Sequence, residues 1–456
     1  MANIVDSADT AGKPALKRVI GRGMLLCFVV GDILGAGIYA LVGKVAGHVG
    51  GMLWLPFLLA FVLASLTAAA YAELVGKYSR ASGAALYVHQ AFGVPFVTFI
   101  VAFAVMMSGV TSASAAARAF GGSYLAEFVT LPVLVSALIF LGLVTLVNFV
   151  GISESVKVNV VLTVIEAFGL LVIIAIGIYA LSMGQGNPAR AIEFNPANSA
   201  LLSVLGGTAL AFYALLGFED SVNLAEEAKN PPKDFPFALF GGLIIAALIY
   251  IAVAFTAAML VDTRTLTTSS GPLLEVVKVA GLAFPPKLFA MIALLAVSNT
   301  ALMNMIMASR LVYGMARERV VPPVFAVVHP SRSTPWVAIL FTVAIAVVLV
   351  ATGDVGNLAE TTVLLLLCAF ALVNVSVLVL RHRPVDHDHY RAPTWMPVLG
   401  ALACLVLILP ITGRDPAVYA RAGVLIAIGM ALWFVNRVFV QRVVEETGLP
   451  TMTPEG

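Results

Sequence analysis

The stretch that decides the fold lies at residues 31–47 and reads GDILGAGIYALVGKVAG. It is apolar enough to enter a membrane, yet Gly31, Gly35 and Gly37 lie close together within it. A glycine costs about 1 kcal/mol in a helix interior and frees backbone groups. At membrane depth, such groups are tolerated only where they are buried in protein or line a cavity. We therefore expect a membrane span that is broken at 35–38, although close packing against another helix also explains the glycines.

The composition of the whole chain indicates a membrane protein. Of the 456 residues, 61% are hydrophobic and 11% are charged, and the mean hydropathy is +1.02. Soluble domains carry about 25% charged residues, so most of this exterior must face the lipid bilayer. The formal net charge of +2 gives no reason to expect nucleic acid as a partner. Cys27, Cys368 and Cys404 lie in apolar runs without metal-ligand spacing, so we expect no metal site.

Apolar runs of the length needed to cross a bilayer, about 20 residues, recur along the whole chain. Short connections join them, so we expect a single transporter domain with polar tails. We count twelve runs, near 22–42, 52–75, 93–117, 131–149, 156–182, 198–224, 236–261, 286–312, 335–352, 357–380, 395–413 and 416–438.

The basic residues favour one orientation of these spans. When the spans alternate, 18 of the 26 Lys and Arg residues fall on the side of the N-terminus and 8 fall on the other side. Cytoplasmic loops carry an excess of Lys and Arg. We therefore expect a multi-pass protein of the cell membrane with both termini in the cytoplasm. The polar start of the chain lacks the cleavage pattern of a removed signal peptide.

A second broken span is expected in the sixth run, at 213–221. Gly217 is followed there by Glu219 and Asp220 in an otherwise apolar setting. If the chain holds two five-span repeats, the first and sixth spans correspond. Broken helices at matching positions of two repeats are the sequence feature that best indicates a transporter's binding site. The two breaks together therefore predict a transporter with its site between them.

Four motifs in order extend this interpretation over most of the chain. They are GDILGAGIY (31–39), YAELVGKYSRASGAALYVHQAFG (71–93), GFEDSVNLAEEAKNPPKDFP (217–236) and SRLVYGMARERVVPPVFAVVHPSRSTP (309–335). They resemble motifs of the amino acid–polyamine–organocation superfamily. The resemblance implies an all-α membrane protein with the leucine-transporter fold. Its twelve helices would form two inverted repeats of five, at 22–182 and 198–380, with helices 1 and 6 broken, and two peripheral helices at 395–438.

The resemblance also implies how a substrate is held. Amides at the first break would hold its carboxylate, because a helix N-terminus offers free N–H groups and partial positive charge. These amides belong to Gly35, Ala36, Gly37 and Ile38. Carbonyls from Tyr213 to Gly217, with Leu216 as a contact, would hold its amine. The ring of Tyr213 would cover the substrate, which suits an amine through cation–π attraction; an ordinary buried aromatic is the alternative.

Acidic residues inside the membrane are candidates for function because burying their charge is costly. Glu219 matches a glutamate that links gate movement to occupancy in related exchangers. Asp220 either binds a cation or caps the half-helix that follows. Asp32 lies near the inner end of the first span. Glu73 closes the second span and belongs to its loop motif, which favours a gate or structural role.

Glu166 lies in the middle of the fifth run, where a lysine often occurs in proton-coupled proteins that this chain resembles. A buried carboxylate can carry a proton, or it can bind sodium, which favours oxygen ligands. No Lys or Arg lies at comparable depth in another span, which argues against a permanent ion pair. We expect proton binding, with sodium as the alternative. Ser298 and Asn299 in the eighth run either supply oxygen atoms to this ion-coupling site or hydrogen-bond between helices.

Two further segments carry polar residues. Met107 and Ser108 belong to MMSGVTSASAAA (106–117), whose small residues either let helices pack closely or line the substrate cavity. The loop RHRPVDHDHYR (381–391) has three histidines. Metal ligands need a fixed spacing, so we expect a solvated loop instead.

These features predict secondary active transport of amino acids, with cationic amino acids and related amines among the candidate substrates. We expect alternating access driven by a proton gradient; an amino acid or polyamine exchanger and a sodium-coupled symporter are the alternatives. The chain has no nucleotide-binding P-loop and no pairing of catalytic groups, and a channel would need a continuous selectivity filter. We expect a small-molecule substrate, no cofactor, no enzymatic activity, and a monomer or homodimer.

Overall fold

Helices make up most of the protein. The computed structural model describes residues 18–79, 83–150, 156–194, 199–280 and 284–447, without the side chains of 156–160 and 439–447. Over these ranges the only extended pairings are two isolated bridges, Ile20 with Ala228 and Gly50 with Phe194. The expected all-α class is thus confirmed.

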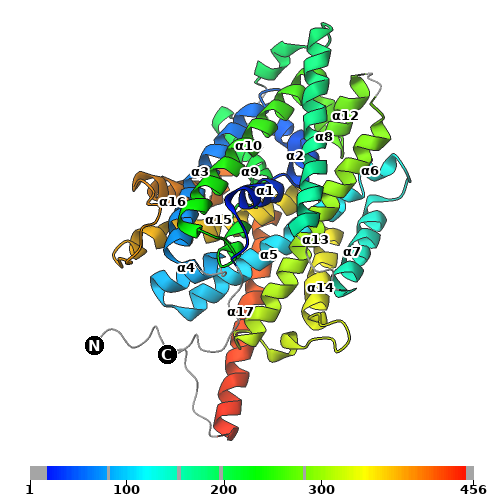
Figure 1. The fold of residues 1–456 in the computed structure, drawn as a ribbon. Helices are drawn as coiled ribbons and strands as arrows, with labels where there is room; N and C mark the ends of the chain where they lie inside the picture. The colour runs from blue at the N-terminus through cyan, green and yellow to red at the C-terminus, as the bar shows by residue number, and fades with distance from the viewer. Residues whose placement is uncertain (1–17, 80–82, 151–155, 195–198, 281–283, 448–456) are drawn as a thin grey trace.

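The main helices follow the apolar runs of the sequence (Figure 1). They are α1 (Arg22–Ile33), α2 (Ala36–Val49), α3 (Trp54–Lys77), α5 (Pro95–Phe120), α7 (Val133–Val150), α8 (Val156–Ser182), α9 (Ala200–Ala214), α10 (Pro231–Leu260), α13 (Pro286–Arg317), α14 (Trp336–Thr352), α15 (Val355–Leu380), α16 (Trp395–Ile408) and α17 (Pro416–Thr447). Shorter elements connect them: α4 (Gly83–Phe92), α6 (Ser123–Ala126), α11 (Thr263–Thr268), α12 (Pro272–Val279) and the 3₁₀ helices η1 (Pro188–Ile192), η2 (Asp220–Leu224), η3 (Pro323–Ala326) and η4 (Pro410–Thr412).

The helix lengths make this a multi-pass membrane protein. Within the described residues, eight helices are long and apolar enough to cross a membrane, and the bent pair of α1 and α2 makes a ninth candidate. The helices α9, α14 and α16 are apolar but shorter, at 10–17 residues. A straight crossing takes about 20 residues, so these three helices need tilt or a thinner bilayer to cross.

The expected break in the first span is present, and it is narrow. The helices α1 and α2 meet at an angle of 43°. Only Leu34 and Gly35 lie between them, and Gly35 is extended, with φ −106° and ψ −157°. Ala36, Gly37 and Ile38 therefore form the first turn of α2, where amides have no acceptor within the helix.

The second break is wider than the first. The helix α9 ends at Ala214, and the next α-helix, α10, begins at Pro231. Capping a half-helix after the break is one of the two roles that the sequence leaves open for Asp220, but only the 3₁₀ helix η2 forms there. Its N-cap is Glu219, without a side-chain cap bond. Gly217 has φ +120°, which ends the helical path, and Asp, Ser and Asn in 220–223 compete with helical backbone bonds.

The broken helices lie at the centre of the bundle. The helix α1 packs against α8 and α10, and α2 packs against α9. The helix α5 lies between α13 and α15 and packs against both. In Figure 1, α1 is seen in the middle of the molecule with α8 and α10 on either side. These contacts gather both breaks and the middles of α5, α13 and α15 in one region.

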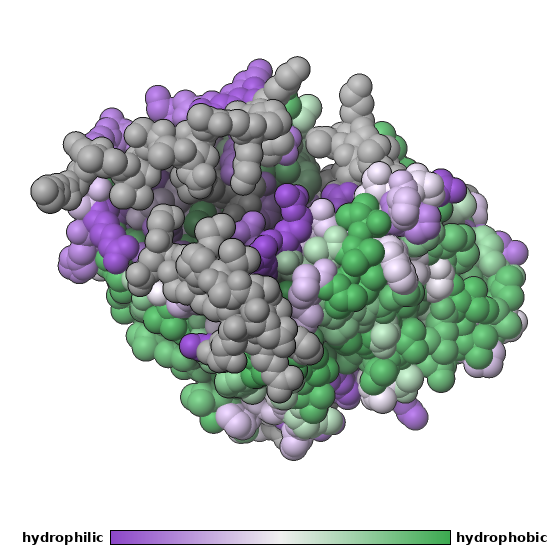
Figure 2. Space-filling view, turned by 90° about the horizontal axis from the view of Figure 1, so that it is seen from below, coloured by the Kyte–Doolittle hydropathy of each residue, from purple (hydrophilic) through white to green (hydrophobic). Residues whose placement is uncertain are grey.

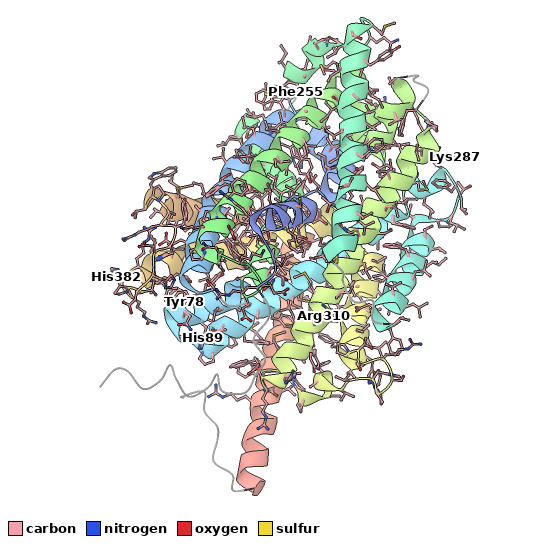
Figure 3. All side chains as sticks on the ribbon, viewed as in Figure 1. Tyr78, His89, Phe255, Lys287, Arg310 and His382 are labelled. Atoms are coloured by element: carbon pink, nitrogen blue, oxygen red, sulfur yellow. The ribbon has the colours of Figure 1, made fainter. Side chains whose placement is uncertain are left out.

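The charged residues of α13 lie toward its two ends. Lys287 and Arg310, near opposite ends of α13, are labelled in Figure 3. Seen from below in Figure 2, hydrophilic residues gather in the middle and along one side of the molecule, and the flanks are hydrophobic. Five basic residues used for the orientation, Lys13, Lys17, Arg80, Lys157 and Arg442, have side chains outside the described residues.

Candidate functional site

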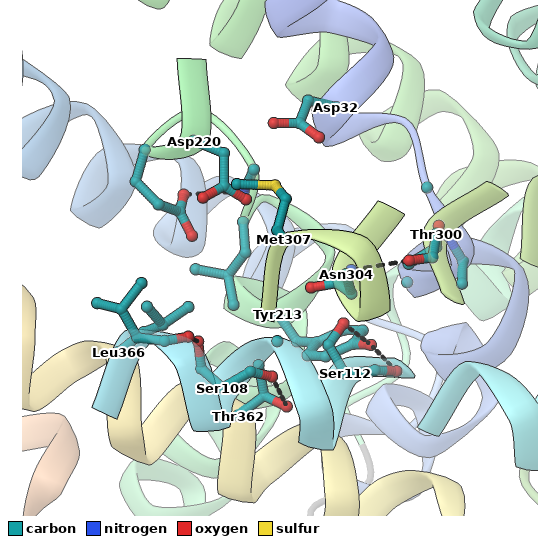
Figure 4. Close-up of a pocket in the computed structure, with 18 of the residues that line it drawn as sticks. Asp32, Ser108, Ser112, Tyr213, Asp220, Thr300, Asn304, Met307, Thr362 and Leu366 are labelled. Atoms are coloured by element: carbon teal, nitrogen blue, oxygen red, sulfur yellow. Dashed lines mark hydrogen bonds between the residues drawn. The ribbon is translucent and has the colours of Figure 1, made fainter. Parts of the chain in front are cut away.

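A cavity of ≈ 80 Å³ lies between the two breaks and the helices α5, α13 and α15 (Figure 4). Residues of both predicted breaks line it together, although they lie far apart in the sequence. The lining residues are Asp32, Ile33, Gly35, Ala36 and Gly37 from the first break; Tyr213, Ala214, Leu216, Gly217, Glu219 and Asp220 from the second; and Val105, Met106, Ser108, Gly109, Ser112, Thr300, Asn304, Met307, Ala308, Leu311, Thr362 and Leu366 from the other helices.

The four amides at the first break have different surroundings. The amide of Gly35 donates to the carbonyl of Ile33 at 2.8 Å, and the amide of Ala36 donates to the Thr300 hydroxyl at 3.0 Å. The amides of Gly37 and Ile38 have no hydrogen-bond partner among the described residues outside their own helix. Because they belong to the first turn of α2, they are the two that can receive a carboxylate.

The glycines of the breaks also allow the two segments to approach each other closely. A Cβ atom added to Gly37 would lie 2.6 Å from the Cα of Ala214, and one added to Gly217 would lie 2.5 Å from the carbonyl oxygen of Asp32. Gly37 and Gly217 therefore each lie against the backbone of the other break. Close packing and a broken helix, which the sequence leaves as alternatives for the first span, occur together here.

The cavity is acidic. Its lining includes the carboxyl groups of Asp32, Glu219 and Asp220 and no Lys, Arg or His. One oxygen of Glu219 accepts a hydrogen bond from the amide of Gly217 at 2.8 Å, which fixes the turn of the second break. In Figure 4, Asp32 and Asp220 lie on one side of the cavity. This side suits a positively charged group.

Hydroxyl groups lie on the opposite side of the cavity (Figure 4). The hydroxyl of Tyr213 and that of Ser112 are 2.9 Å apart, and those of Thr362 and Thr111 are 2.7 Å apart. The hydroxyl of Thr362 also reaches the carbonyl of Ser108 at 3.4 Å. The Tyr213 ring is thus held by a hydrogen bond between α9 and α5 at the cavity wall, where the sequence predicts it.

Two predicted substrate contacts lie beside the cavity and not in its lining. The side chain of Met107 is fully buried in the hydrophobic core, and Met106 lines the cavity in its place. The cavity face of α5 carries Val105, Ser108 and Ser112, which follow helical spacing, and Met107 points elsewhere. The side chain of Ile38 is also fully buried, so only its backbone can serve the site.

Sequence reasoning did not identify Thr300 and Asn304 of α13. The Thr300 hydroxyl accepts a hydrogen bond from the backbone amide of Ala36 at 3.0 Å. The side-chain amide of Asn304 donates one to the backbone carbonyl of Thr300 at 2.9 Å. Both residues line the cavity. Their spacing of four residues places them on one helix face, and polar residues repeated at this spacing in an apolar run could have marked that face.

The predicted ion-coupling residues do not lie together: Asp220 lines the cavity, and the others lie outside its lining. Glu166 is almost fully buried in α8, and one of its oxygens accepts a hydrogen bond from the Asn299 amide at 3.3 Å. The hydroxyl of Tyr39 donates to the backbone carbonyl of Glu166 at 2.8 Å. The Ser298 hydroxyl instead donates to the Leu294 carbonyl of its own helix, at 2.6 Å. Asp220, the fourth predicted residue, lines the cavity, and Glu166 does not.

Glu73 joins three segments at the end of α3. Its carboxylate accepts two hydrogen bonds from Arg381, at 2.8 and 2.6 Å, and one from the Ala392 amide at 2.8 Å. Arg381 lies just beyond α15, and this contact with Glu73 raises its pKa above the usual value. In the same loop, a ring nitrogen of His387 lies 2.9 Å from the carbonyl oxygen of Gly76. The loop 381–391, expected to be solvated, therefore packs partly against α3.

Comparison with known proteins agrees with this geometry. The family model for amino acid permeases matches residues 21–435. The branched-chain amino acid permease of Bacillus subtilis (strain 168) is 25% identical over 448 residues, which are 94% of each chain. The methylthioribose transporter of the same organism is 26% identical over 450 residues, 94% of this chain and 95% of that protein.

A plant relative covers less of the length. The chloroplastic cationic amino acid transporter 9 of Arabidopsis thaliana is 28% identical over 346 residues, 71% of this chain and 59% of that protein. These relatives are transporters, in agreement with the two breaks that meet at a cavity. The chain belongs to the amino acid permease family of the amino acid–polyamine–organocation superfamily, and it is an amino acid transporter and not an enzyme.

Proposed function

We propose that the protein is a secondary active transporter that carries cationic amino acids or related amines across the cell membrane by alternating access. All twelve apolar units would cross the bilayer, with both termini in the cytoplasm. The residues 22–182 and 198–380 would form the two inverted repeats, and 395–438 the peripheral helices, of one transporter domain. The observation that carries the substrate class is the cavity lined by Asp32, Glu219 and Asp220 and by no basic residue.

Each end of a cationic amino acid has a complementary partner at the site. The α-carboxylate would accept from the Gly37 and Ile38 amides at the start of α2. The α-amine would donate to carbonyls of the second break, near Leu216. The charged end of the side chain would lie beside Glu219 and Asp220, where opposite charge lowers its energy. The ring of Tyr213 would add a cation–π contact.

Coupling would depend on Glu166, which lies behind the first break and outside the cavity. Its side chain is 1% exposed, and no salt bridge between described residues involves it. A buried carboxyl group with one neutral donor is suited to bind a proton, since protonation removes a charge that burial disfavours. Loading of Glu166 would favour one facing state, and release would favour the other. Sodium coupling and exchange are the alternatives.

The substrate class is tested by uptake into proteoliposomes. We expect saturable uptake of radiolabelled arginine that lysine inhibits and leucine does not. In Glu219→Gln, the apparent affinity for arginine should fall roughly 10- to 100-fold, the effect of losing one charge-assisted contact. Glu193→Gln, which changes an exposed acid outside the cavity, is the matched control. Equal uptake of leucine and arginine by the wild-type protein would overturn the cationic assignment.

The coupling ion is tested in the same vesicles with imposed gradients. An inward proton gradient should drive accumulation in the wild-type protein and not in Glu166→Gln, which should still catalyse counterflow. Full pH-driven accumulation by Glu166→Gln would exclude Glu166 as the coupling group. Accumulation that follows only a sodium gradient supports the sodium alternative, and uptake that requires internal substrate supports exchange.

A further inference from the structure

A second concave surface lies on the outside of the bundle, between α14 and α17. It is an apolar groove of ≈ 540 Å³. Its lining contains one charged residue, Arg421, and one other polar residue, Thr352. The apolar lining residues are Phe341, Ala344, Ile345, Val348, Leu349, Ala420, Val424, Leu425 and Ile428.

The groove is open to the membrane. Val348 and Val424 on its edges are 59% and 61% exposed, whereas Leu349 and Leu425 beneath them are 3% exposed. The helix α17 is one of the candidate spans, and α14 is an apolar helix. An apolar groove at this position excludes water in favour of hydrocarbon. Its natural occupant is therefore an acyl chain.

The length of the groove fits one leaflet. It follows α14 from Phe341 to Thr352, a rise of about 16 Å at 1.5 Å per residue. The hydrocarbon core of a bilayer is about 30 Å thick, so the groove spans close to half of it. An acyl chain that starts at the Thr352 end would reach the middle of the membrane.

Arg421 marks the end of the groove at which a headgroup would lie. Its guanidinium donates to the Thr361 hydroxyl at 3.3 Å and to the Thr352 carbonyl at 3.5 Å. The helix α14 ends at Thr352, so Arg421 lies at the level where this helix leaves the apolar region. Both contacts are long, and a guanidinium has five N–H donors arranged to bind a phosphate with two bonds at once.

We propose that this groove binds an anionic phospholipid, with one acyl chain between α14 and α17 and the phosphate at Arg421. The positive charge at one end and the apolar lining along the rest match the two parts of such a lipid. A second copy of the chain fits less well, because two concave grooves that face each other in a symmetric dimer leave a void between them. The proposal does not depend on which substrate or ion the transporter uses.

The test is native mass spectrometry of the full chain released from detergent. The probes are phosphatidylglycerol and phosphatidylcholine with identical acyl chains. We expect the wild-type protein to retain phosphatidylglycerol about fivefold more than phosphatidylcholine, the ratio that corresponds to ~1 kcal/mol for one basic residue at an anionic lipid surface. In Arg421→Gln, this preference should fall to about one. Lys287→Gln, which removes an exposed positive charge outside the groove, should retain it.

A second variant tests the acyl part independently of the charge. Ala344 is exposed in the groove, so Ala344→Phe should fill it without disturbing the core and should lower retention of both lipids. Leu340→Phe, on the same helix outside the groove, is its control and should bind as the wild type does. Unchanged lipid preference in Arg421→Gln, or unchanged retention in Ala344→Phe, overturns the proposal. A dimer peak that Ala344→Phe removes also overturns it, in favour of self-association.

Discussion

The side-chain amide of Asn299 in α13 donates a hydrogen bond to the Glu166 carboxylate in α8 across 3.3 Å. The second oxygen of this carboxylate is buried and has no hydrogen-bond partner among the described residues. One neutral donor therefore holds a group that burial makes costly to charge. The second oxygen can therefore take up a proton, and the hydrogen bond links α8 to the helix that also carries Thr300 and Asn304.

Replacing Asn299 should impair ion coupling through Glu166. Asn299→Ala removes the donor to Glu166, so we expect a stability loss of about 1–3 kcal/mol and reduced pH-driven accumulation. Ser298→Ala is the neighbouring control, because its hydroxyl bonds only its own helix and should be dispensable. The measurements are thermal unfolding in detergent and accumulation in proteoliposomes. Equal accumulation in both variants would show that Asn299 has no part in coupling.

A methyl group at Gly37 should interfere with transport. In Gly37→Ala, the added Cβ would lie 2.6 Å from the Cα of Ala214, so α2 and α9 would have to move apart at the cavity. Overpacking of this kind costs about 1–3 kcal/mol. We expect initial uptake rates to fall roughly tenfold or more. Gly142→Ala, where an added Cβ has no atom within 4 Å, is the matched control and should transport normally.

The ion pair of Glu73 and Arg381 should contribute to stability. Glu73→Gln would leave the Arg381 guanidinium without its charged partner, and removing one partner of a buried pair costs about 3–5 kcal/mol. We expect less than this, because Arg381 is partly exposed. A double-mutant cycle with Arg381→Gln, measured by thermal unfolding, isolates the interaction energy of the pair. A coupling energy near zero would contradict the predicted contribution to stability.

The sign of the pH dependence of this pair follows from Arg381. Its pKa is raised in the folded protein, chiefly by the hydrogen bonds to Glu73. The resulting stability is present below the pKa of an arginine in the unfolded chain and is lost only as the pH rises through the higher pKa of the folded protein. Arg381 thus stays charged from pH 6 to 9. The destabilisation caused by Arg381→Gln should be constant over this range when unfolding is measured at each pH.

Substitutions at Tyr213 should distinguish its ring from its hydroxyl. Tyr213→Phe removes the contact with Ser112 and keeps the ring face, so arginine affinity should change only a few-fold. Tyr213→Leu removes the ring, and the loss of a cation–π contact of about 0.5–2 kcal/mol should weaken affinity roughly 2- to 30-fold. Substrate competition in proteoliposomes measures both. A larger effect of Tyr213→Phe than of Tyr213→Leu would indicate that the hydroxyl, and not the ring, determines binding.

The sequence predicted the positions of the helices well. Apolar runs of sufficient length mark membrane helices because backbone groups in lipid must be satisfied within the segment. Both breaks were also predicted, from Gly35 and from Gly217 with its neighbouring acids. The half-helix expected after the second break is the 3₁₀ helix η2 instead, because a hydropathy pattern does not distinguish a 3₁₀ turn followed by loops from a short helix.

The site was predicted in part, and the limits are physical. The residues 35–37, Tyr213 and Glu219 line the cavity as the motifs imply. The sequence did not identify Thr300 and Asn304 as lining residues, because which face of α13 points into the cavity depends on how this helix is rotated against the first break. Met107 was chosen where Met106 lines the cavity, since neighbouring residues of a helix point about 100° apart and only packing decides which one faces inward.

The sequence by itself determined that this chain is a membrane transporter whose apolar runs are interrupted near Gly35 and Gly217. Hydropathy, helix-breaking glycines and acidic residues within apolar runs are features of a local segment, so they can be recognised in the sequence of that segment alone. Only the tertiary structure decided that Gly37 contacts Ala214 and that the Ala36 amide donates a hydrogen bond to the Thr300 hydroxyl. It also decided that the Asn299 side chain donates a hydrogen bond to Glu166 outside the substrate cavity. These contacts join segments far apart in the chain, so they depend on how the helices pack and not on any one of them.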